Sequence, residues 1–432
     1  PNPRPARAAR RVDGSRSGAR RARPRTDDPR GSRGARPDAD GGVLAGADGR
    51  GPRRGTNAYR GESSPAGMRA VVCSDFGESS VEEVERPDPA PDEVLLAVRR
   101  VQLSVTECSL YRGAEIAHYE QITARLADGP ARLFGHEFCA EVVERGAAVD
   151  EFDVGDRVYA PGKIPCGECP LCERGFERRC RDLEYVGYDR PGALAEYVAL
   201  PTDPLARVPD GVTDAEAAAM QPLATTLVAV DDADVSTGDV VAVIGAGVVG
   251  HQAAQLALER GASEAFAVDV DSRKLSIAEG NGLRPIDARE ADPVAVVRDR
   301  TDGIGADRTF EAVGGDQNDM TAGDDPIAQA FRMTRRGGVV SQMGHIVGEV
   351  TLRPRVVRSR GIDWLNPSAD ARYLTPNVHS GDLAARLVAE DRVSIEAYTT
   401  HVFGGLERFE RMVEVTLNKP EHDALGAAQI EL

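Results

Sequence analysis

The sequence predicts an α/β protein in which a small, irregular β-barrel precedes a doubly wound parallel sheet. From Met68 onward, short β-rich runs alternate with Gly, Pro and Asp turns, as expected of a small barrel. Residues 239–244 form a continuous apolar run, the kind of strand that a parallel sheet buries on both faces. Alternating strand and helix signals then continue to about Ile346. At 432 residues, two domains are expected.

The β-rich part and the C-terminal segment both give element predictions. Strands are predicted at 70–73, 93–98, 141–143 and 156–159, and a helical pattern at 215–230. Further helices are predicted at 383–390 and 406–415. These patterns place the β-rich domain at 68–225, the parallel-sheet domain at 226–366 and a final segment at 367–432. No run approaches the roughly 20 apolar residues that cross a bilayer.

Residues 1–67 differ from the rest of the chain. They contain mostly Arg, Gly, Ala, Pro, Asp and Ser, too few large apolar residues to offset ordering entropy, so we expect disorder. One interpretation is a basic arm that binds nucleic acid. Another is a twin-arginine export signal at Arg10-Arg11, but the apolar stretch that such a signal needs does not follow. Because the first methionine is Met68, at the start of a strand, we favour an upstream translation artefact.

Charge is distributed unevenly. The net charge of −17 divides into +9 for residues 1–67 and −26 for the remainder, and the chain has only three lysines. An acidic surface repels itself in dilute buffer, and molar salt with a Debye length of about 3 Å screens that repulsion. We therefore expect a halophilic protein, with neither nucleic acid nor membrane as partner of residues 68–432. Scattered Cys73, Cys108 and Cys139 suit a reducing, cytoplasmic compartment.

Four cysteines provide the strongest local signal. Cys166, Cys169, Cys172 and Cys180 have the spacing C-x2-C-x2-C-x7-C. A ferredoxin-type cluster would need a last gap of three residues followed by proline. Disulfides are possible in principle, but two of the three intervals hold only two residues. Four thiolates this close can surround Zn²⁺ and leave no open position, so we predict a structural zinc lobe at 166–180.

A glycine-rich loop follows the apolar strand at 239–244. Gly245, Gly247 and Gly250 stand between that strand and a plausible helix, as a dinucleotide-binding fingerprint requires. The helix N-terminus would face the cofactor's phosphates. A second strand at 264–268 ends at Asp269, whose carboxylate can accept hydrogen bonds from an adenine ribose and would repel a 2′-phosphate. We therefore expect NAD, with NADP less favoured.

Together these motifs resemble the zinc-containing medium-chain dehydrogenase/reductase family over essentially all of 68–432. The resemblance rests on the start at Met68, residues 101–113, 135–137, 154–158 and 192–197, the four cysteines and the glycine fingerprint. It implies a GroES-like catalytic domain built from both chain ends around a Rossmann domain. It also implies a homodimer or homotetramer that moves a hydride between an alcohol, polyol or sugar and NAD(P).

The resemblance also implies an active site, and here the chain departs from its relatives. His136 matches a catalytic zinc ligand, with Glu137 beside it. Ser104 stands where the family has a cysteine, in a Cys-Gly-Thr-Asp-like motif, and Gln221 stands where the polyol branch has a glutamate. Thr106 keeps the hydroxyl that passes the substrate proton, whereas Ser109 replaces a relay histidine.

A zinc ligand set of Ser, His and Gln carries little negative charge, so the predicted catalytic zinc needs other donors. Glu107, Glu137, Cys108 and Cys139 lie close in sequence to the matched positions. The cysteines fit better as small buried side chains. The leading hypothesis is a zinc-dependent alcohol, polyol or sugar dehydrogenase with Thr106, His136 and Glu137 at its catalytic centre. The alternatives are a zinc-free reductase of the same family and a non-catalytic NAD-binding module.

Overall fold

The computed structural model describes residues 67–317, 325–367 and 371–432. The expectations for residues 1–66 lie outside this described part. The described residues all belong to one compact unit. Within the described residues, no helix is both long and apolar enough to pass through a bilayer.

The β-rich domain is built around one long central strand. Strand β3 (Glu93–Gln102) pairs antiparallel with three partners along its length: β4 (Glu137–Arg145), β6 (Tyr197–Pro201) and β19 (Gln429–Glu431). The sheet continues through β5 (Arg157–Tyr159) and β7 (Ala206–Arg207). The hairpin of β1 (Gly67–Asp75) and β2 (Glu78–Glu85) joins it through a bridge between Ala70 and Ala195. This arrangement confirms the predicted β-barrel-like domain.

The second domain is a fully parallel sheet. Its strand order is β10-β9-β8-β11-β13-β15, the 3-2-1-4-5-6 order of a doubly wound fold. The strands are β8 (Val240–Ile244), β9 (Glu264–Asp269), β10 (Arg284–Asp287), β11 (Ala306–Glu311), β13 (Thr334–Gln342) and β15 (Asp363–Leu365). The order reverses between β8 and β11, which is where such sheets bind ligands.

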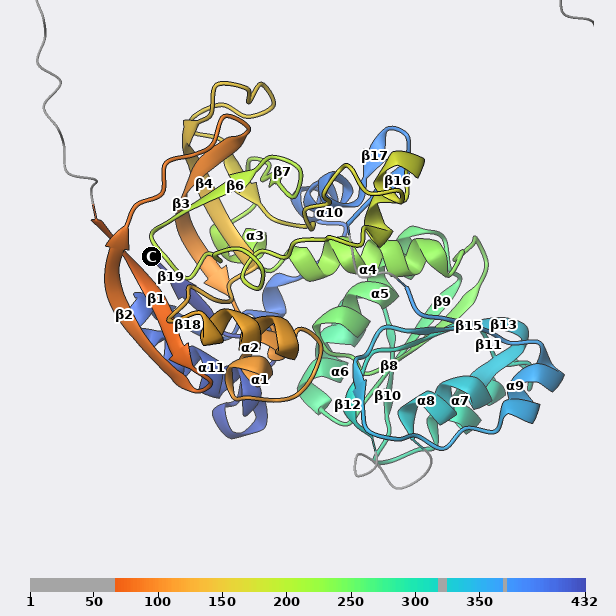
Figure 1. Cartoon of the computed structure of the whole chain (residues 1–432). Helices are drawn as coiled ribbons and strands as arrows, with labels where there is room; N and C mark the ends of the chain where they lie inside the picture. Colours follow the sequence, from red (N-terminus) through yellow and green to blue (C-terminus); the bar gives the residue numbers. More distant parts are fainter. Residues whose placement is uncertain (1–66, 318–324, 368–370) are drawn as a thin grey trace, which may run out of the picture. The chain divides into compact units, whose positions relative to one another are not determined.

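Helices cover both faces of this sheet. Val241 and Val243 of β8 pack on one face against α4 (Gln221–Asp232), α5 (Val248–Glu259) and α10 (Ser380–Ala389). Ala242 and Ile244 point the opposite way, toward α7 (Pro293–Arg300) and α8 (Pro326–Met333). In Figure 1, α4 and α5 lie above the sheet and α7 and α8 below it. Burial on both faces explains the continuous apolar run of β8.

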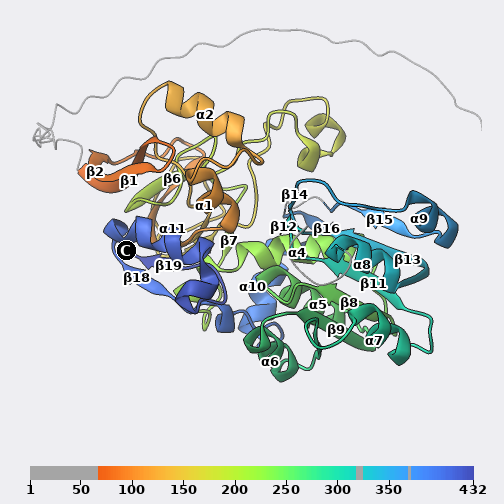
Figure 2. The same cartoon turned by 90° about the horizontal axis from the view of Figure 1, so that it is seen from below.

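The C-terminal segment returns to the β-rich domain. Strand β18 (Val402–Gly404) pairs with β19, which in turn pairs with β3 more than 300 residues earlier in the chain. Helix α11 (Phe409–Leu417) packs beside α1 (Val105–Tyr111), as Figure 2 also shows. Both chain ends of the described part therefore build one domain, as the resemblance implies.

Two helices, α4 and α10, lie close to the domain limits that we predict from the sequence. A boundary at residue 225 would divide α4, which continues to Asp232 and shares a core with α5. The final segment also does not return at once: α10 first packs on α4, in the core that covers the parallel sheet, and the return begins near β18. The periodicity of apolar residues does not show where the chain passes from one domain to the other, because side chains of both domains contribute to one core.

Candidate active site

Helix α1 carries three of the predicted site residues. Ser104 is its N-cap, with its hydroxyl accepting a hydrogen bond from Glu107 N at 3.1 Å, and Glu107 Oε2 accepts one from Ser104 N at 3.0 Å. This reciprocal capping box holds the start of the helix. Thr106 follows in the first turn and lines the cavity described below. The hydroxyl of Ser104 is thus engaged in capping, which weakens it as a metal ligand.

A tight turn brings His136 to Glu107. Phe134 and Gly135 both have positive φ angles, 66° and 83°, and a Cβ at Gly135 would lie 2.9 Å from the Leu194 backbone nitrogen. Glycine is therefore required at this position. The turn presents the Gly135 and His136 N–H groups to Glu107 Oε1, at 2.7 and 3.2 Å.

The His136 ring meets the same carboxylate oxygen. Nδ1 lies 2.8 Å from Glu107 Oε1, the distance of an ion pair, although the ring is not aligned for a straight hydrogen bond. Burial alone would raise the pKa of Glu107, but protonated His136 and the N–H donors outweigh it and lower the pKa. Burial alone would lower the pKa of His136, and Glu107 outweighs that effect and raises it. Glu107 therefore backs the ring and leaves Nε2 as its free nitrogen.

Glu137 stands on the other side of the imidazole. Its Oε1 lies 3.8 Å from His136 Nε2, and its Oε2 accepts a 2.6 Å hydrogen bond from Gln102 Nε2. Gln429 in β19 donates in turn to Gln102 Oε1 at 3.1 Å. Burial raises the pKa of Glu137 to about 7. His136 Nε2 and Glu137 Oε1 are thus neighbouring atoms, but of these two residues only Glu137 lines the cavity described below.

The glycine fingerprint lies at the switch point of the sheet. Gly245 has φ 93°, and a Cβ at Gly250 would come 1.9 Å from the Gly245 carbonyl oxygen, so both glycines are sterically required. A Cβ at Gly247 would meet only open space, because this residue faces the cavity. Gly247 is also the N-cap of α5. The loop leaves room for a phosphate at the helix N-terminus.

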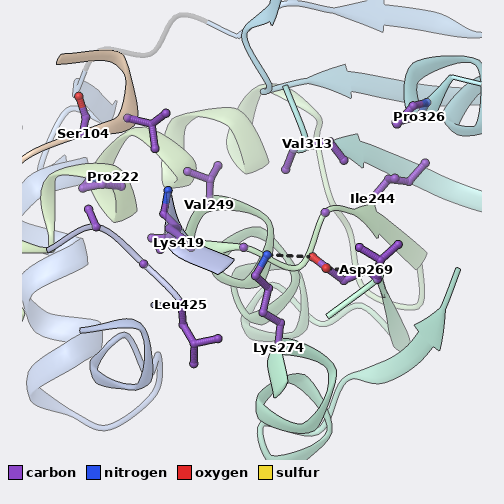
Figure 3. A pocket seen from close by; sticks show the side chains of 18 of the residues that line it. Ser104, Pro222, Ile244, Val249, Asp269, Lys274, Val313, Pro326, Lys419 and Leu425 are labelled. Carbon is purple, nitrogen blue, oxygen red and sulfur yellow. Dashed lines mark hydrogen bonds and ion pairs between the residues drawn. The ribbon is translucent and has the colours of Figure 1, made fainter. Parts of the chain in front are cut away.

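Asp269, the last residue of β9, lies against the glycine loop. Its carboxylate accepts backbone N–H bonds from Ala246 at 2.9 Å, Val270 at 2.8 Å and Asp271 at 2.9 Å. Lys274 Nζ lies 3.6 Å from Oδ2, the contact drawn as a dashed line in Figure 3. The side chain is buried at the end of β9 and fixed against the glycine loop. Its negative charge is partly balanced by Lys274.

One cavity of about 600 Å³ is lined by residues from both parts, although neither His136 nor Glu107 is among them (Figure 3). Its lining includes Gln102, Ser104, Thr106 and Glu137 from the β-rich domain. It also includes Gly245, Gly247, Val249, Asp269 and Lys274 from the parallel-sheet domain, and Lys419 and Leu425 from the C-terminal segment. A volume of this size suits a small molecule or cofactor. The cavity places the loop that would hold a dinucleotide beside Thr106 and Glu137.

The four lobe cysteines come together as the spacing predicts. Their sulfur atoms all lie within 4.8 Å of one another, with 3.4 Å between Cys166 and Cys180 and 3.6 Å between Cys169 and Cys172. Around zinc with bonds of about 2.3 Å, tetrahedral sulfurs would be roughly 3.8 Å apart. A two-way backbone bridge between Ile164 and Glu184 closes the base of the lobe. The cluster fits one four-coordinate zinc.

Three other candidates lie differently. Gln221 begins α4 and is half-buried, and its neighbour Pro222, not Gln221, lines the cavity. Cys108 is fully buried against α11, and burial raises the pKa of its thiol. Cys139 Sγ lies 3.5 Å from Asp214 Oδ1, and burial raises the pKa of the Cys139 thiol to about 12. These two neutral thiols are packing residues rather than ligands of a site at His136.

Sequence reasoning missed three cavity residues. Gln102 fixes Glu137, Lys274 pairs with Asp269, and Lys419 reaches the cavity from the C-terminal segment. The scarcity of lysine was one available signal, since two of the three lysines in the chain line this cavity. Gln102 lies two residues before Ser104, but nothing in its local pattern indicates that it faces inward.

Comparison with known proteins identifies the family. Residues 90–210 match the alcohol dehydrogenase GroES-like domain, and residues 248–366 match the zinc-binding dehydrogenase domain. A sorbitol dehydrogenase from Halalkalibacterium halodurans is 32% identical over 283 residues, covering 64% of this chain and 77% of that protein. An erythritol/L-threitol dehydrogenase from Mycolicibacterium smegmatis is 27% identical over 368 residues, covering 83% and 96%.

Further relatives point the same way. The chain is 35% identical over 233 residues to an L-threonine 3-dehydrogenase from Chelativorans, covering 54% of this chain and 65% of that protein. A zinc-binding dehydrogenase from Sinorhizobium meliloti, solved with NADP, superposes with a TM-score of 0.70 at 26% identity, covering 85% of this chain and 100% of that one. The chain belongs to the zinc-type medium-chain alcohol dehydrogenase family. It is an alcohol- or polyol-type oxidoreductase whose family uses zinc and NAD(P).

Proposed function

We propose that the chain oxidises polyols or similar alcohols that carry a second polar group beside the reacting carbinol, with NAD as cofactor. The observation that carries this proposal is the single cavity with Thr106 and Glu137 at one end and the glycine loop with Asp269 at the other. The relatives named for sorbitol, erythritol/L-threitol and threonine support the substrate class, since each of those substrates has such a neighbouring group.

The donors at His136 suit a weakly held zinc. Catalytic zinc takes about three protein ligands and keeps one position open. Here His136 Nε2 and Glu137 Oε1 are free to face an ion, whereas both Glu107 oxygens are occupied by N–H and imidazole contacts. Among the described residues, His, Cys, Asp and Glu form a cluster of three or more only in the cysteine lobe. Glu107 is thus a supporting residue, not the replacement ligand expected from the sequence.

His136 and Glu137 would hold the zinc, which when bound polarises the substrate oxygen while the nicotinamide ring accepts the hydride. Glu107 fixes the orientation of the imidazole by its contact with Nδ1. Gln102 holds Glu137 by its amide. Thr106 supplies a hydroxyl in the cavity that can receive the substrate's proton. A second hydroxyl of the substrate would compensate for the missing third protein ligand, which favours polyols over simple alcohols.

A substrate screen tests this proposal. Purified protein should oxidise C4–C6 polyols with NAD at a kcat/KM at least tenfold above that for the matching primary alcohols. Two zinc ions should be present per chain at saturation, and mild chelation should remove one together with activity. Control protein lacking His136, as His136→Ala, should keep the tightly held zinc and lose turnover. NAD binding without turnover on any alcohol would contradict the proposal.

The shortage of ligands also supports a second candidate, a zinc-free reductase of the same family. Ser104 is committed to capping α1, and Gln221 does not line the cavity. This candidate would be favoured by one tightly held zinc per chain and by reduction of activated carbonyl or alkene substrates at the same rate before and after mild chelation. The metal count during stepwise chelation separates the two.

We also propose a cytoplasmic, halophilic homo-oligomer, supported by the charge of −26 on residues 68–432. The expected result is a thermal midpoint that rises by at least 10 °C between 0.1 M and 2 M KCl. An unchanged midpoint over that range contradicts the halophilic proposal. Sedimentation in the same buffers measures the dimer or tetramer.

A further inference from the structure

Lys419 reaches the cavity from a part of the chain remote from the glycine loop. It begins the short 3-10 helix η5 (Lys419–His422), directly after α11 and Asn418. Figure 3 shows its side chain extending into the space that Val249 and Pro222 also line. Nζ donates a 2.7 Å hydrogen bond to the Thr416 carbonyl oxygen. The side chain is thus half-buried, and its ammonium group is held by a carbonyl oxygen at the C-terminal end of α11.

This ammonium group forms no ion pair with any residue that the structure describes. Among the ion pairs formed by described residues, none includes Lys419, whereas Lys274 in the same cavity pairs with Asp269. Burial lowers the pKa of Lys419 to about 8; Cys108 opposes this shift, and the positive charge of Lys274 adds to it. A desolvated cation whose one hydrogen bond goes to a neutral carbonyl oxygen is unfavourable compared with one that has a negatively charged partner. A bound anion would remove this cost, so the cavity is prepared for negative charge at this point.

The neighbouring groups define which anion fits. The cavity begins at Asp269 and Lys274 and ends at Thr106 and Glu137, and Lys419 lines it together with the loop that starts α5. The first N–H groups of a helix have no partner within the helix and favour an anion. In a dinucleotide, the group between the two nucleosides is a diphosphate. Lys419 lines the cavity between its two ends, so its ammonium group would lie beside the diphosphate of a dinucleotide that spans the cavity.

We propose that Lys419 is a cofactor-binding residue that pairs with the diphosphate of the dinucleotide, opposite the N-terminus of α5. This inference rests on the proposed dinucleotide-dependent function and adds a residue from the C-terminal segment to it. The helix supplies N–H groups from one side, and Lys419 supplies a full positive charge from the other. Both NAD and NADP carry this diphosphate, so Lys419 contributes affinity without selecting between them.

A second contact fixes the segment that carries Lys419. Arg273 in α6 (Ser272–Gly280) pairs with Asp271 at 2.8 Å, and its guanidinium also contacts the Asp423 side chain and, at 3.3 Å, the Asp423 carbonyl oxygen. Asp423 directly follows η5. The C-terminal segment is therefore tied to the helix after Asp269, which holds Lys419 near the phosphate site before cofactor arrives.

Binding of cofactor fragments tests the proposal without turnover. Titration calorimetry with ADP-ribose and with adenosine compares wild-type protein with Lys419→Met and Lys419→Arg. Lys419→Met should weaken ADP-ribose binding at least tenfold and change adenosine binding by less than twofold. Lys419→Arg should restore ADP-ribose binding to within about threefold of wild type. Equal affinity of wild type and Lys419→Met for ADP-ribose would overturn the proposal.

Two controls separate this role from a structural one. Lys163→Met removes a lysine outside the cavity and should leave ADP-ribose affinity unchanged. Without ligand, Lys419→Met should unfold at the same temperature as wild type or higher, because an unpaired desolvated charge is removed. A loss of several degrees would assign Lys419 to packing and overturn the proposal. Failure of wild-type protein to bind ADP-ribose would instead contradict the dinucleotide function itself.

Discussion

Glu107 Oε1 lies 2.8 Å from His136 Nδ1 and also accepts the backbone N–H groups of Gly135 and His136. One buried carboxylate thus holds both the ring and the turn that carries it. Its other oxygen is held by Ser104 N. Glu107 therefore couples the start of α1 to the start of β4, and the free Nε2 of His136 owes its direction to this coupling. Such supporting carboxylates commonly fix a metal-binding imidazole.

Replacing Glu107 with Gln should weaken the site without unfolding the protein. Glu107→Gln keeps the shape and removes the charge, so we expect about 10–100-fold weaker binding of the labile zinc and at least a tenfold lower kcat. The free energy of unfolding should fall by about 1–3 kcal/mol. The side-chain NH2 group of the introduced glutamine can no longer accept the hydrogen bonds that the buried Glu107 oxygens accept from backbone N–H groups. Competition with a chelator and urea unfolding measure these quantities. Glu141→Gln, at a partly exposed glutamate of β4 that pairs with Arg99, is the control. Equal zinc affinity in all three proteins would contradict the assignment.

The cysteine lobe should be structural. Cys172→Ser removes one of four thiolates, so we expect loss of the tightly held zinc and a fall of several degrees in the thermal midpoint. Mass spectrometry under native conditions and calorimetry measure both. Cys73→Ser, at a buried cysteine of β1, should keep the full zinc content. If Cys172→Ser retained metal and stability and lost only the chemical step, the structural role would be wrong.

Asp269 should set the cofactor preference. In Asp269→Ser, the carboxylate that would repel a 2′-phosphate is gone and Lys274 loses its partner. We expect the ratio of kcat/KM for NAD over NADP to fall at least tenfold. Asp287→Ser, at the end of the neighbouring strand β10, is a control that should leave the ratio unchanged. A wild-type enzyme with the higher kcat/KM for NADP would refute the prediction.

His251 should make stability depend on pH. This residue of α5 is 1% exposed, its Nδ1 has no hydrogen-bond partner among the described residues, and burial lowers its pKa to about 4. In the unfolded chain the pKa of His251 is near 6.5, so the imidazole takes up a proton as the pH falls from 6.5 to 4. In the folded state the imidazole stays neutral over most of this range. The free energy of unfolding therefore falls by at most about 3 kcal/mol as the pH drops through this window.

The variant His251→Gln isolates this effect from the many carboxylates. Urea unfolding at intervals from pH 7.5 to 4 should show wild-type stability declining more steeply than that of the variant between pH 6.5 and 4. Above pH 7 the two curves should run parallel. Parallel curves over the whole range would mean that His251 titrates alike in the folded and unfolded states.

The sequence predicted the fold because its signals are local. Val240–Ile244 is apolar at every position since both of its faces are covered, and the fingerprint glycines follow directly from the turn they form. The cysteine spacing likewise defines the lobe without reference to other segments. Such local signals do not show that α4 continues across residue 225, where side chains of both domains share a core.

The active site was less accessible to such reasoning, because its contacts join distant segments. Glu107 was a candidate ligand by its closeness in sequence to Ser104, yet the fold turns it behind His136. Gln102 meets Glu137 across the β3–β4 register, and Lys419 arrives from more than 170 residues beyond Gly245. Only the sheet pairing and the return of the C-terminal segment bring these side chains together.

The distribution of lysine has a practical consequence for handling the protein. Lys163, Lys274 and Lys419 are its only lysines, and none of them is fully exposed. Lys163 stacks on Tyr185, and the other two line the 600 Å³ cavity. Coupling through surface amines to a resin or a dye would therefore find few targets, and forcing conditions would acylate the cavity. Attachment through the many carboxylates is the route that spares the two cavity lysines.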